Sequence, residues 1–406
     1  MVITERTQVA IIGAGPAGLL LSHLLSLEGI ESVVIEQRSW EYCLSRVRAG
    51  VLEHEVADLL VDAGLGDRMR RDGLVHDGIE LRVDGRRHRI DFKALTGRSV
   101  TVYGQQEITR DLIEHRTATG GDLRFEATDA EIHDHLLERP RVTFTHEWQR
   151  VELVCDVIAG CDGFHGISRE TIAADRRSVS TITYPYAWLG ILARAAPATD
   201  ELIYASHPNG FALYSMRSPT VSRLYLQVDP EDRLADWPER RIWDELDVRL
   251  ATVDDPSWRV GRGPLMERII SPMRSFVSEP MQEGRLFLAG DASHIVPPTG
   301  AKGLNLAAHD VILLSRALVA LLRDGDGSPC ARYSRDCLAR VWRAEDFSMF
   351  MTRLLHRSDD PFEERARLAR LRYVCASAAA QHSLAENYVG LPAADLEPGR
   401  RDRGLA

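Results

Sequence analysis

A glycine-rich turn near the start of the chain constrains the fold more than any other feature. An apolar run of β type, residues 8–12, leads directly into Gly13-Ala-Gly15-Pro-Ala-Gly18, and an apolar helical segment follows. Glycines at these positions let the backbone approach a phosphate at the helix N-terminus. A second apolar run ends in Glu36, 18 residues after Gly18, where a ribose-binding acid is expected. The pattern predicts a βαβ unit with a dinucleotide site.

Two further motifs place an aspartate beside a glycine just after an apolar strand. They are Asp162-Gly163 and Gly290-Asp291. Either motif alone is more simply an ordinary Asp-Gly turn. The glycine-rich turn by itself fits a nicotinamide nucleotide as well as a flavin nucleotide, so the motifs taken singly leave that choice open.

The composition excludes several classes of protein. With 406 residues, 44% hydrophobic and 27% charged, the chain resembles a globular protein of two or three domains. The net charge of −10 argues weakly against a general nucleic-acid binder. The six cysteines form no CxxC pair and no histidine cluster has metal-ligand spacing, which predicts reduced thiols and no metal site. The apolar stretches lack a signal-peptide pattern and are broken or short, so we expect no membrane span and a cytoplasmic location.

Alternating strand and helix patterns predict an α/β fold (α+β overall) with a discontinuous, Rossmann-like dinucleotide-binding domain. A sheet-rich second domain is expected where β-branched and aromatic runs replace the helical pattern. The expected segments are 1–180 for the first domain, with a β excursion at about 74–97 toward the second; 181–272 for the second domain; 273–345 to complete the first; 346–396 as a helical end; and 397–406 as a frayed tail. Helical spacing also predicts a helix from Val51 to Leu65.

The order of the three motifs resembles that of the flavoprotein aromatic hydroxylases, whose chains carry GxGxxG, then Asp-Gly, then Gly-Asp. The likeness is closest to the members that hydroxylate 4-hydroxybenzoate, and it covers all but the tail after about residue 397. The string from Gly290 to Asn305 is especially specific. The matching stretches are Thr7 to Leu21, Arg46 to Glu53, Arg71 to His76, Thr101 to Asp111, Ile158 to Arg169, Glu201 to Ser218, Gly284 to Ala308 and Ala385 to Leu391.

This resemblance implies an FAD-dependent monooxygenase of aromatic compound catabolism. It would convert 4-hydroxybenzoate to 3,4-dihydroxybenzoate (protocatechuate) with O2 and NADPH or NADH, through a flavin C4a-hydroperoxide. Two alternatives stay open: a hydroxylase of a related amino- or methoxy-substituted benzoate, and a flavin-binding sensor or interaction module without this chemistry. Because family members are commonly homodimers, the resemblance also implies a homodimer.

The resemblance assigns cofactor roles residue by residue. Glu36 would hold the adenosine ribose, Asp291 the ribityl chain, and Leu304 with Asn305 would meet the isoalloxazine ring. Asp162 and Gly163 would lie near both FAD and the nicotinamide coenzyme. The full set expected at FAD is Gly13, Gly15, Ala17, Gly18, Glu36, Arg46, Arg48, Gln105, Asp162, Gly163, Arg223, Gly290, Asp291, Leu304 and Asn305.

The second domain would bind the aromatic acid. Arg217, with Ser215 and Tyr225, resembles the family's carboxylate site, and a guanidinium fork suits a carboxylate. Tyr204 would hydrogen-bond the phenol and pass its proton through Tyr388 toward His76. This relay is chemically reasonable because phenol and tyrosine have similar pKa values near 10. Without the family match, the arginine would be an edge residue and the tyrosines core residues. The resemblance also implies that the carbonyl of Pro298 contacts the substrate hydroxyl and that Thr299 lies at the ring.

Some of the positions expected to hold the nicotinamide coenzyme match the family, and others depart from it. Arg223 matches a residue linked to movement of the flavin between buried and exposed positions. The segment Gln37-Arg38 departs from the Arg-Gln pair of NADPH-specific members, which leaves the preference between NADPH and NADH open. Tyr214 replaces a smaller residue near the substrate strand, and we expect it to alter the tolerance for substituted rings. The coenzyme set is Arg38, Tyr42, Arg48, His165, Arg169 and Arg274.

Overall fold

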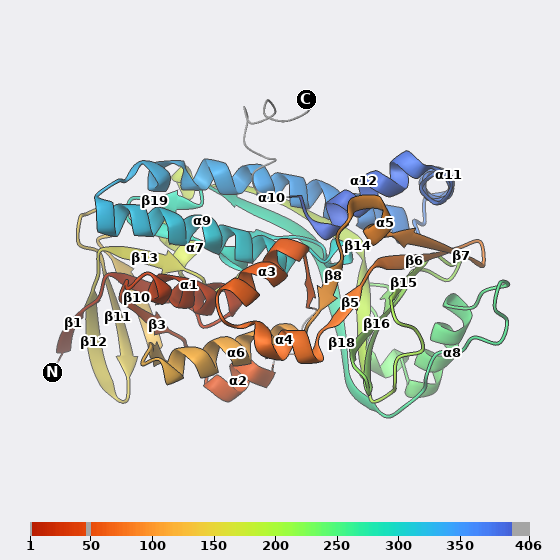
Figure 1. Cartoon of the computed structure of the whole chain (residues 1–406), viewed down its shortest axis with the longest axis horizontal. Coiled ribbons are helices and arrows are strands. Elements are labelled where there is room, and N and C mark those ends of the chain that lie inside the picture. Colours follow the sequence, from red (N-terminus) through yellow and green to blue (C-terminus); the bar gives the residue numbers. More distant parts are fainter. Residues whose placement is uncertain (1, 46–49, 392–406) are drawn as a thin grey trace.

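The computed structural model describes residues 2–45 and 50–391 of the chain. Within these residues the strands form four sheets, and helices pack around them (Figure 1). The predicted mixed α/β fold is confirmed. Arg46 and Arg48, both predicted at the cofactor, and the tail from 397 lie outside the described residues.

A six-stranded sheet carries the glycine-rich turn. Its inner strands are all parallel, so their carboxyl ends meet at one edge of the sheet. In spatial order the strands are β19 (Gln282–Glu283), β20 (Leu286–Leu288), β13 (Val157–Gly160), β2 (Val9–Ile12), β3 (Ser32–Ile35) and β9 (Asp122–Arg124). The last residues of β2, β3, β13 and β20 are in register, which brings the motifs predicted at Gly13, Glu36, Asp162 and Gly290 to the same edge.

An eight-stranded sheet forms the other half of the molecule, on the right in Figure 1. Its strands, in spatial order, are β21 (His294–Ile295), β18 (Leu265–Glu279), β14 (Ser178–Ala193), β17 (Val221–Val228), β16 (Ala212–Ser218), β15 (Leu202–Ala205), β6 (Gly78–Val83) and β7 (Arg86–Asp91). The excursion at 74–97 therefore contributes β6 and β7 to this sheet. The boundaries expected at 181 and 272 fall inside β14 and β18, which run on as continuous strands.

Two smaller sheets complete the strand inventory of the described residues. One contains β1 (Val2–Arg6), β12 (Gln149–Val154), β11 (Arg141–His146) and β10 (Thr128–His133), and the other contains β4 (Val51–Leu52), β8 (Val100–Val102) and β5 (Leu74–His76). The prediction of a helix beginning at Val51 was wrong. Val51 and Leu52 form strand pairs with β8, so these two residues are not helical. The helix begins only at His54.

The helices divide between the two large sheets. They are α1 (Pro16–Leu27), α2 (Trp40–Ser45), α3 (His54–Asp62), α4 (Gly66–Asp72), α5 (Phe92–Thr96), α6 (Gln105–Ala118), α7 (Ser168–Thr171), α8 (Glu239–Arg249), α9 (Gly303–Asp324), α10 (Ser328–Leu355), α11 (Pro361–Ala376) and α12 (Ala378–Val389). Short 3-10 turns are η1 (Ala174–Arg176), η2 (Leu234–Asp236), η3 (Gly290–Ala292) and η4 (Pro298–Gly300). α10 runs unbroken across the boundary expected at 345.

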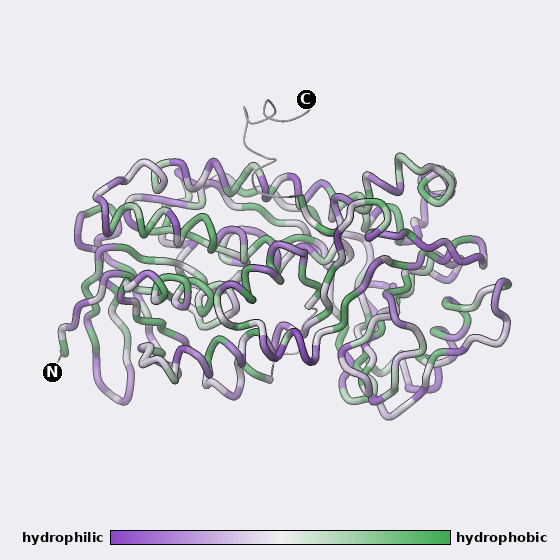
Figure 2. The backbone as a smooth tube through the Cα atoms, viewed as in Figure 1, coloured by the Kyte–Doolittle hydropathy of each residue, from purple (hydrophilic) through white to green (hydrophobic). Residues whose placement is uncertain are grey.

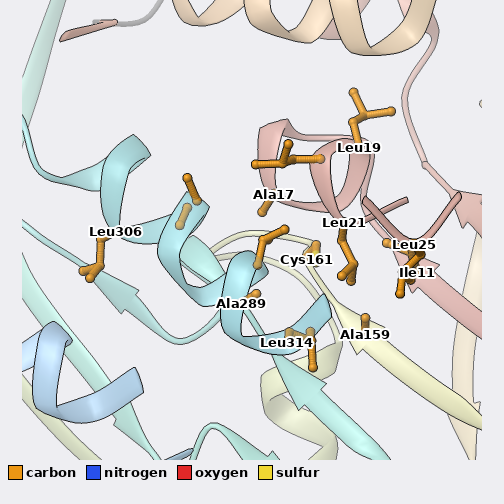
Figure 3. Packing of buried hydrophobic residues seen from close by; sticks show 14 of the residues in the cluster. Ile11, Ala17, Leu19, Leu21, Leu25, Ala159, Cys161, Ala289, Leu306 and Leu314 are labelled. Carbon is orange, nitrogen blue, oxygen red and sulfur yellow. The ribbon is translucent and has the colours of Figure 1, made fainter. Parts of the chain in front are cut away.

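The largest core lies between the six-stranded sheet and the helices α1, α6 and α9. Figure 3 shows Ala17, Leu21, Cys161, Ala289 and Leu314 packed there. In Figure 2 this interior is largely green, whereas the edge strand β7 is purple. α9 is long and apolar enough to cross a membrane by composition, but 61% of its most apolar window is buried inside the protein. α9 is therefore a core helix of this fold.

The two faces of the eight-stranded sheet are covered by different helices. One face packs on α8 through Ile242, Trp243 and Leu246. The other face packs on the C-terminal end of α10 and on α11 and α12. Because side chains alternate along a strand, neighbouring residues of β15, β16 and β17 enter different cores.

Candidate active site

The glycine-rich turn between β2 and α1 is shaped by close backbone contacts and by one open position. Gly13 has φ +105°, and a Cβ there would lie 2.4 Å from the Cys161 carbonyl oxygen. A Cβ on Gly18 would lie 2.0 Å from the Gly13 oxygen. At Gly15, in contrast, a Cβ would have nothing within 4 Å. Gly13 and Gly18 are therefore required by packing, whereas Gly15 faces space that a ligand can enter.

The N-terminus of α1 provides the donors for an anion. Among the described residues no side chain caps its first N–H groups, and Gly15 stands at the N-cap with Pro16 after it. The uncapped N–H groups and the helix dipole favour a pyrophosphate at this end. Ala17 is buried beside this turn and so leaves the entrance to the N-terminus unobstructed. These features fit the diphosphate of a dinucleotide such as FAD.

Glu36 lies directly after β3 and is held by the main chain. One carboxylate oxygen accepts the N–H of Ala14 and the other accepts the N–H of Arg38, each at 2.8 Å. A carboxylate offers about four lone-pair positions, so these two bonds leave acceptors for the hydroxyls of a ribose. The side chain is thus orientated before any ligand binds.

Asp162 and Gly163 follow β13 at the same edge. One oxygen of Asp162 accepts the N–H and the hydroxyl of Ser168, both at 2.9 Å. The other, Oδ1, is buried and has no hydrogen-bond partner in the described part of the chain. Burial raises the pKa of this carboxyl. Gly163 has φ +73°, with nothing within 4 Å of a Cβ built on it. The orphaned oxygen and the adjoining open space fit a polar ligand group at this strand end.

Gly290 and Asp291 form η3 after β20. Gly290 has φ +65°, and its N–H donates to Asp310 Oδ2 at 2.9 Å. Asp291 is half-buried at the sheet edge. Farther along, Asn305 Oδ1 accepts the Glu53 N–H at 2.9 Å, and its Nδ2 donates to the Val51 and Ala301 carbonyls at 2.8 Å. The side chain of Asn305 therefore ties the start of α9 to β4.

The remaining residues predicted at the cofactor border the same region. Leu304 lines an apolar hollow with Ala17 and Leu52. Gln105 is the first residue of α6 and is half-buried. Together with the strand-end motifs, these positions surround the N-terminus of α1 with groups suited to a flavin dinucleotide.

Ser215, Tyr225 and Tyr204 share one face of the eight-stranded sheet. Tyr204 pairs with Leu213, Leu213 with Tyr225, and Ser215 with Arg223, so these residues form adjacent cross-strand rows. Arg223 is buried on this face and pairs with Glu267 at 3.4 Å. The register brings together three of the residues predicted for the aromatic acid.

Arg217 lies two residues beyond Ser215 on β16, where the pairing with β17 shifts register. Its Nη1 donates to Ser215 Oγ at 3.2 Å and to the Met216 carbonyl at 2.9 Å. Its Nε is buried and has no partner among the described residues. Burial lowers the pKa of the guanidinium, and nearby Tyr225 opposes that shift. Arg217 is half-buried, but a buried N–H donor without an acceptor is costly unless a ligand accepts from it. The site is therefore suited to a carboxylate.

Tyr204 and Tyr388 form a buried hydroxyl pair. Their oxygens are 2.6 Å apart, and the Tyr204 hydroxyl also points to the Thr299 carbonyl at 3.4 Å. Both side chains are 2% exposed. Burial raises the pKa of Tyr204 well above its usual value and that of Tyr388 to about 12, so both hydroxyls keep their protons at neutral pH. The first step of the predicted relay is thus a direct hydrogen bond.

His76 lies on β5 and is 1% exposed. Within residues 2–45 and 50–391, neither of its ring nitrogens has a hydrogen-bond partner. Burial lowers its pKa to about 4, so the ring is neutral. The structure thus joins the first two members of the predicted relay directly and does not join His76 to them by a direct hydrogen bond.

Three residues predicted for the nicotinamide coenzyme surround Phe164. The guanidinium groups of Arg274 and Arg169 lie 4.7 and 4.8 Å from its ring centroid, and the His165 ring lies at 5.0 Å. Arg169 is buried and donates to the Ala292 and Phe164 carbonyls, whereas His165 and Arg274 are exposed. Arg38 and Tyr42 form a separate exposed pair near α2, with the guanidinium 5.3 Å from the ring centroid.

Comparisons with known proteins identify the family of the chain. A family model described as an FAD binding domain matches residues 6–348. The p-hydroxybenzoate hydroxylase of Acinetobacter baylyi is 49% identical over 96% of this chain and 96% of its own length. The chain belongs to the flavoprotein aromatic hydroxylases. The 6-hydroxy-3-succinoylpyridine 3-monooxygenase of Pseudomonas putida is 26% identical over 80% of this chain and 82% of its own.

A solved structure supports the fold of this hydroxylase. The p-nitrophenol 4-monooxygenase of Pseudomonas putida superposes with a TM-score of 0.81 at 19% identity, covering 96% of this chain and 99% of its own. The predicted family is confirmed. The chain is an FAD-dependent monooxygenase with NAD(P)H as cosubstrate.

One sequence expectation about the site of the hydroxylase was wrong. Tyr214 does not face the substrate residues. It pairs with Ile203 and packs in the core under α8, where its hydroxyl bonds to the Ala198 N–H and to Ser222. Residues 214 and 215 point to opposite faces because side chains alternate along a strand. Tyr214 therefore has no direct route to substituted rings.

Sequence reasoning also missed residues that support the site of the hydroxylase. Lys302 and Glu53 form a buried ion pair at 2.5 Å, and Lys302 donates to the Tyr388 carbonyl at 3.0 Å. A lysine inside an apolar, glycine-rich string was the available signal, because a lysine is rarely buried without a partner. Phe164 was missed although it adjoins Asp162-Gly163. Among the described residues, no three His, Cys, Asp or Glu side chains gather as a metal site would require.

Proposed function

We propose that this chain hydroxylates 4-hydroxybenzoate at the carbon ortho to its phenol, giving 3,4-dihydroxybenzoate, with O2 and NAD(P)H. The observation that carries the proposal is a buried hydroxyl pair, Tyr204 on β15 and Tyr388 on α12, together with the unpartnered Nε of Arg217. The two polar groups of this substrate are a phenol and a carboxylate. The tyrosine pair can hydrogen-bond the phenol, and Arg217 can hydrogen-bond the carboxylate. The 49% identical relative named p-hydroxybenzoate hydroxylase supports the same choice.

Arg217 is proposed to bind the carboxylate. Ser215 already accepts one of its N–H groups, which orientates the guanidinium, and Tyr225 lies one strand away in the adjacent row. A carboxylate accepting from Arg217 would satisfy the buried Nε. Binding at this end directs the phenol of the substrate toward Tyr204.

Tyr204 is proposed to stabilise the phenolate. Because its own pKa is raised, it stays protonated and can donate to the substrate oxygen. Tyr388 can relay the proton because the two hydroxyls are already in hydrogen-bond contact. His76, neutral and with unpartnered nitrogens, is proposed as the final acceptor, reached through water. A phenolate donates electron density to its ortho carbon, which makes that carbon nucleophilic.

FAD supplies the oxygenating chemistry when it is bound. We propose that the α1 N-terminus and Gly15 hold its diphosphate, Glu36 its ribose and Asp291 its ribityl chain. Pro298 and Thr299 would position the substrate ring, since the Thr299 carbonyl already lies beside Tyr204. His165 and Arg274, exposed around Phe164, are proposed to attract the anionic coenzyme, with Arg38 and Tyr42 contacting its adenosine end.

The decisive experiment is an aerobic assay with 4-hydroxybenzoate that measures dihydroxybenzoate formed against coenzyme consumed, with NADH and NADPH compared. We expect nearly equal amounts of product and oxidised coenzyme. A panel of amino- and methoxy-substituted benzoates discriminates the related-substrate alternative. Negligible product from 4-hydroxybenzoate, with coupled product from another member of the panel, would replace the proposed substrate.

We also propose that the protein is a cytoplasmic homodimer, as is common in the family. Light scattering of the FAD-loaded protein tests the dimer, for which twice the chain mass of 45.4 kDa is expected. A mass of one chain would contradict it.

A further inference from the structure

The turn η4, which carries Pro298 and Thr299, is pressed against α10. A Cβ on Gly300 would lie 3.0 Å from Ser348 Oγ and 3.4 Å from a ring carbon of Phe347. The glycine therefore lets the turn lie directly on the helix. On its other side the turn presents the Thr299 carbonyl to Tyr204. Any movement of the turn on α10 would change the surroundings of the Tyr204 hydroxyl.

Thr352, on α10, holds this turn by a side-chain hydrogen bond. Its hydroxyl donates to the hydroxyl of Thr299 at 3.0 Å. Both threonines are fully buried, so water cannot replace this bond without opening the core. The two residues are 53 positions apart in sequence. The bond therefore fixes one element relative to another.

The end of α10 is itself anchored to the sheet that carries Tyr204. His356 Nδ1 lies 2.8 Å from the Thr352 carbonyl, and its Nε2 accepts the Trp188 N–H at 2.6 Å. These partners require the neutral ring with its proton on Nδ1. The ring also stacks on Tyr186 at 4.5 Å and 7°. Trp188 and Tyr186 belong to β14, so the helix end is tied to the eight-stranded sheet.

These contacts close a ring of interactions. It runs from β14 through His356 and Thr352 to Thr299, and from there to Tyr204 on β15 of the same sheet. We propose that Thr352 is a positioning residue for the hydroxylation, whose hydroxyl holds the Pro298–Gly300 turn at the distance from Tyr204 that phenolate formation needs. This inference rests on the proposed function for its effect on catalysis, but not for its effect on the turn.

The test compares Thr352→Val, which removes the hydroxyl and keeps the shape, with Thr352→Ser, which keeps the hydroxyl. In the FAD-loaded Val variant we expect coenzyme oxidation to continue while product per coenzyme falls. The apparent pKa of bound 4-hydroxybenzoate, read from phenolate absorbance, should rise by about one unit, a tenfold change in its ionisation. The Ser variant should restore both values. Thr7→Val, which removes a buried hydroxyl without a partner among the described residues, is the matched control and should change neither.

A second readout needs no substrate. Amide hydrogen exchange of the segment 296–303 in the FAD-loaded protein should accelerate about tenfold in Thr352→Val, the effect of losing one buried hydrogen bond, and return in Thr352→Ser. Wild-type exchange and wild-type phenolate absorbance in the Val variant would overturn the proposal, and so would equal impairment by Val and Ser. If the wild-type protein fails to hydroxylate 4-hydroxybenzoate, the proposed function fails, while the exchange experiment still decides whether Thr352 holds the turn.

Discussion

The two faces of the eight-stranded sheet are built from the same strands, but they differ in how completely their polar groups are hydrogen-bonded. On the face toward α8, the Tyr214 hydroxyl is bonded to the Ala198 N–H and to Ser222, and Arg249 donates to Glu245 and to the Phe211 and Gln227 carbonyls. On the face toward α10 and α12, Arg217 keeps a buried Nε without a partner in the described chain.

This difference supports the proposed location of the substrate site. Buried polar groups are normally satisfied, because an unmade hydrogen bond costs about 1 to 3 kcal/mol. The unpartnered Nε of Arg217 is therefore a donor that the proposed carboxylate would satisfy. A buried donor without a hydrogen-bond partner therefore indicates the proposed site better than the number of polar residues does.

Tyr204→Phe should have the largest effect on the face toward α10 and α12. We expect the hydroxylation rate to fall by about 100-fold or more, because the phenol loses its proton-transfer partner. Coenzyme oxidation should continue, so that coenzyme consumed exceeds dihydroxybenzoate formed and the difference appears as hydrogen peroxide. Stopped-flow reduction and product analysis measure the two steps separately. Full coupling in this variant would remove Tyr204 from phenolate formation.

Arg217→Ala tests the carboxylate site. Removing the cation should weaken substrate binding on the order of 2 to 5 kcal/mol, because the carboxylate would be left without its charged partner. Equilibrium titration of the flavin absorbance with 4-hydroxybenzoate gives the Kd. Arg249→Ala is the control: it removes a buried arginine of α8, on the opposite side of the sheet, and should lower stability while leaving the Kd unchanged. Unchanged binding in Arg217→Ala would place the carboxylate elsewhere.

Much of this arrangement was predictable from the sequence, because its signals lie within short segments of the chain. Glycine spacing, the acid after β3 and the strand-end aspartates are each encoded within a few residues, and parallel pairing then collects them at one edge. The orientation of Tyr214 was also available, since it follows from strand alternation relative to Ser215, but the family comparison obscured it. Thr352 and His356 were not predictable, because their partners lie 53 and 168 residues away in sequence.

Glu345 on α10 is a second buried group that lacks hydrogen-bond partners among the described residues. It is 1% exposed and neither carboxylate oxygen has a hydrogen-bond partner in the described residues, whereas Asp310 accepts from Gly290 N and bonds His294. Burial raises the pKa of Glu345 from 4.5 to about 7. The folded state therefore holds this proton more tightly than the unfolded state, and the stability gained from it below pH 4.5 is lost as the pH rises to about 7.

Glu345→Gln should remove that pH dependence. At pH 8 the variant should be more stable than the wild type by about 3 kcal/mol, because it no longer buries an unpartnered charge, and the difference should shrink toward pH 4.5. Urea unfolding of the FAD-loaded protein across this range measures it. Asp310→Asn, which removes charge from a bonded acid, should instead destabilise at pH 8. A stability difference between Glu345→Gln and the wild type that is constant with pH would show that Glu345 does not titrate in this window.

The smallest effect on catalysis is expected from Tyr214→Phe. This variant removes a tyrosine hydroxyl on the face toward α8, as Tyr204→Phe does on the opposite face. Loss of the hydroxyl leaves the Ala198 N–H without its acceptor, so the free energy of unfolding should fall by about 1 to 3 kcal/mol. Product per coenzyme and the substrate Kd should stay at wild-type values, because Tyr214 faces the core under α8. Urea unfolding and the aerobic assay together measure both halves of this expectation. Uncoupling in Tyr214→Phe comparable to that in Tyr204→Phe would mean that the two faces are not independent, and the assignment of the site to one face would fail.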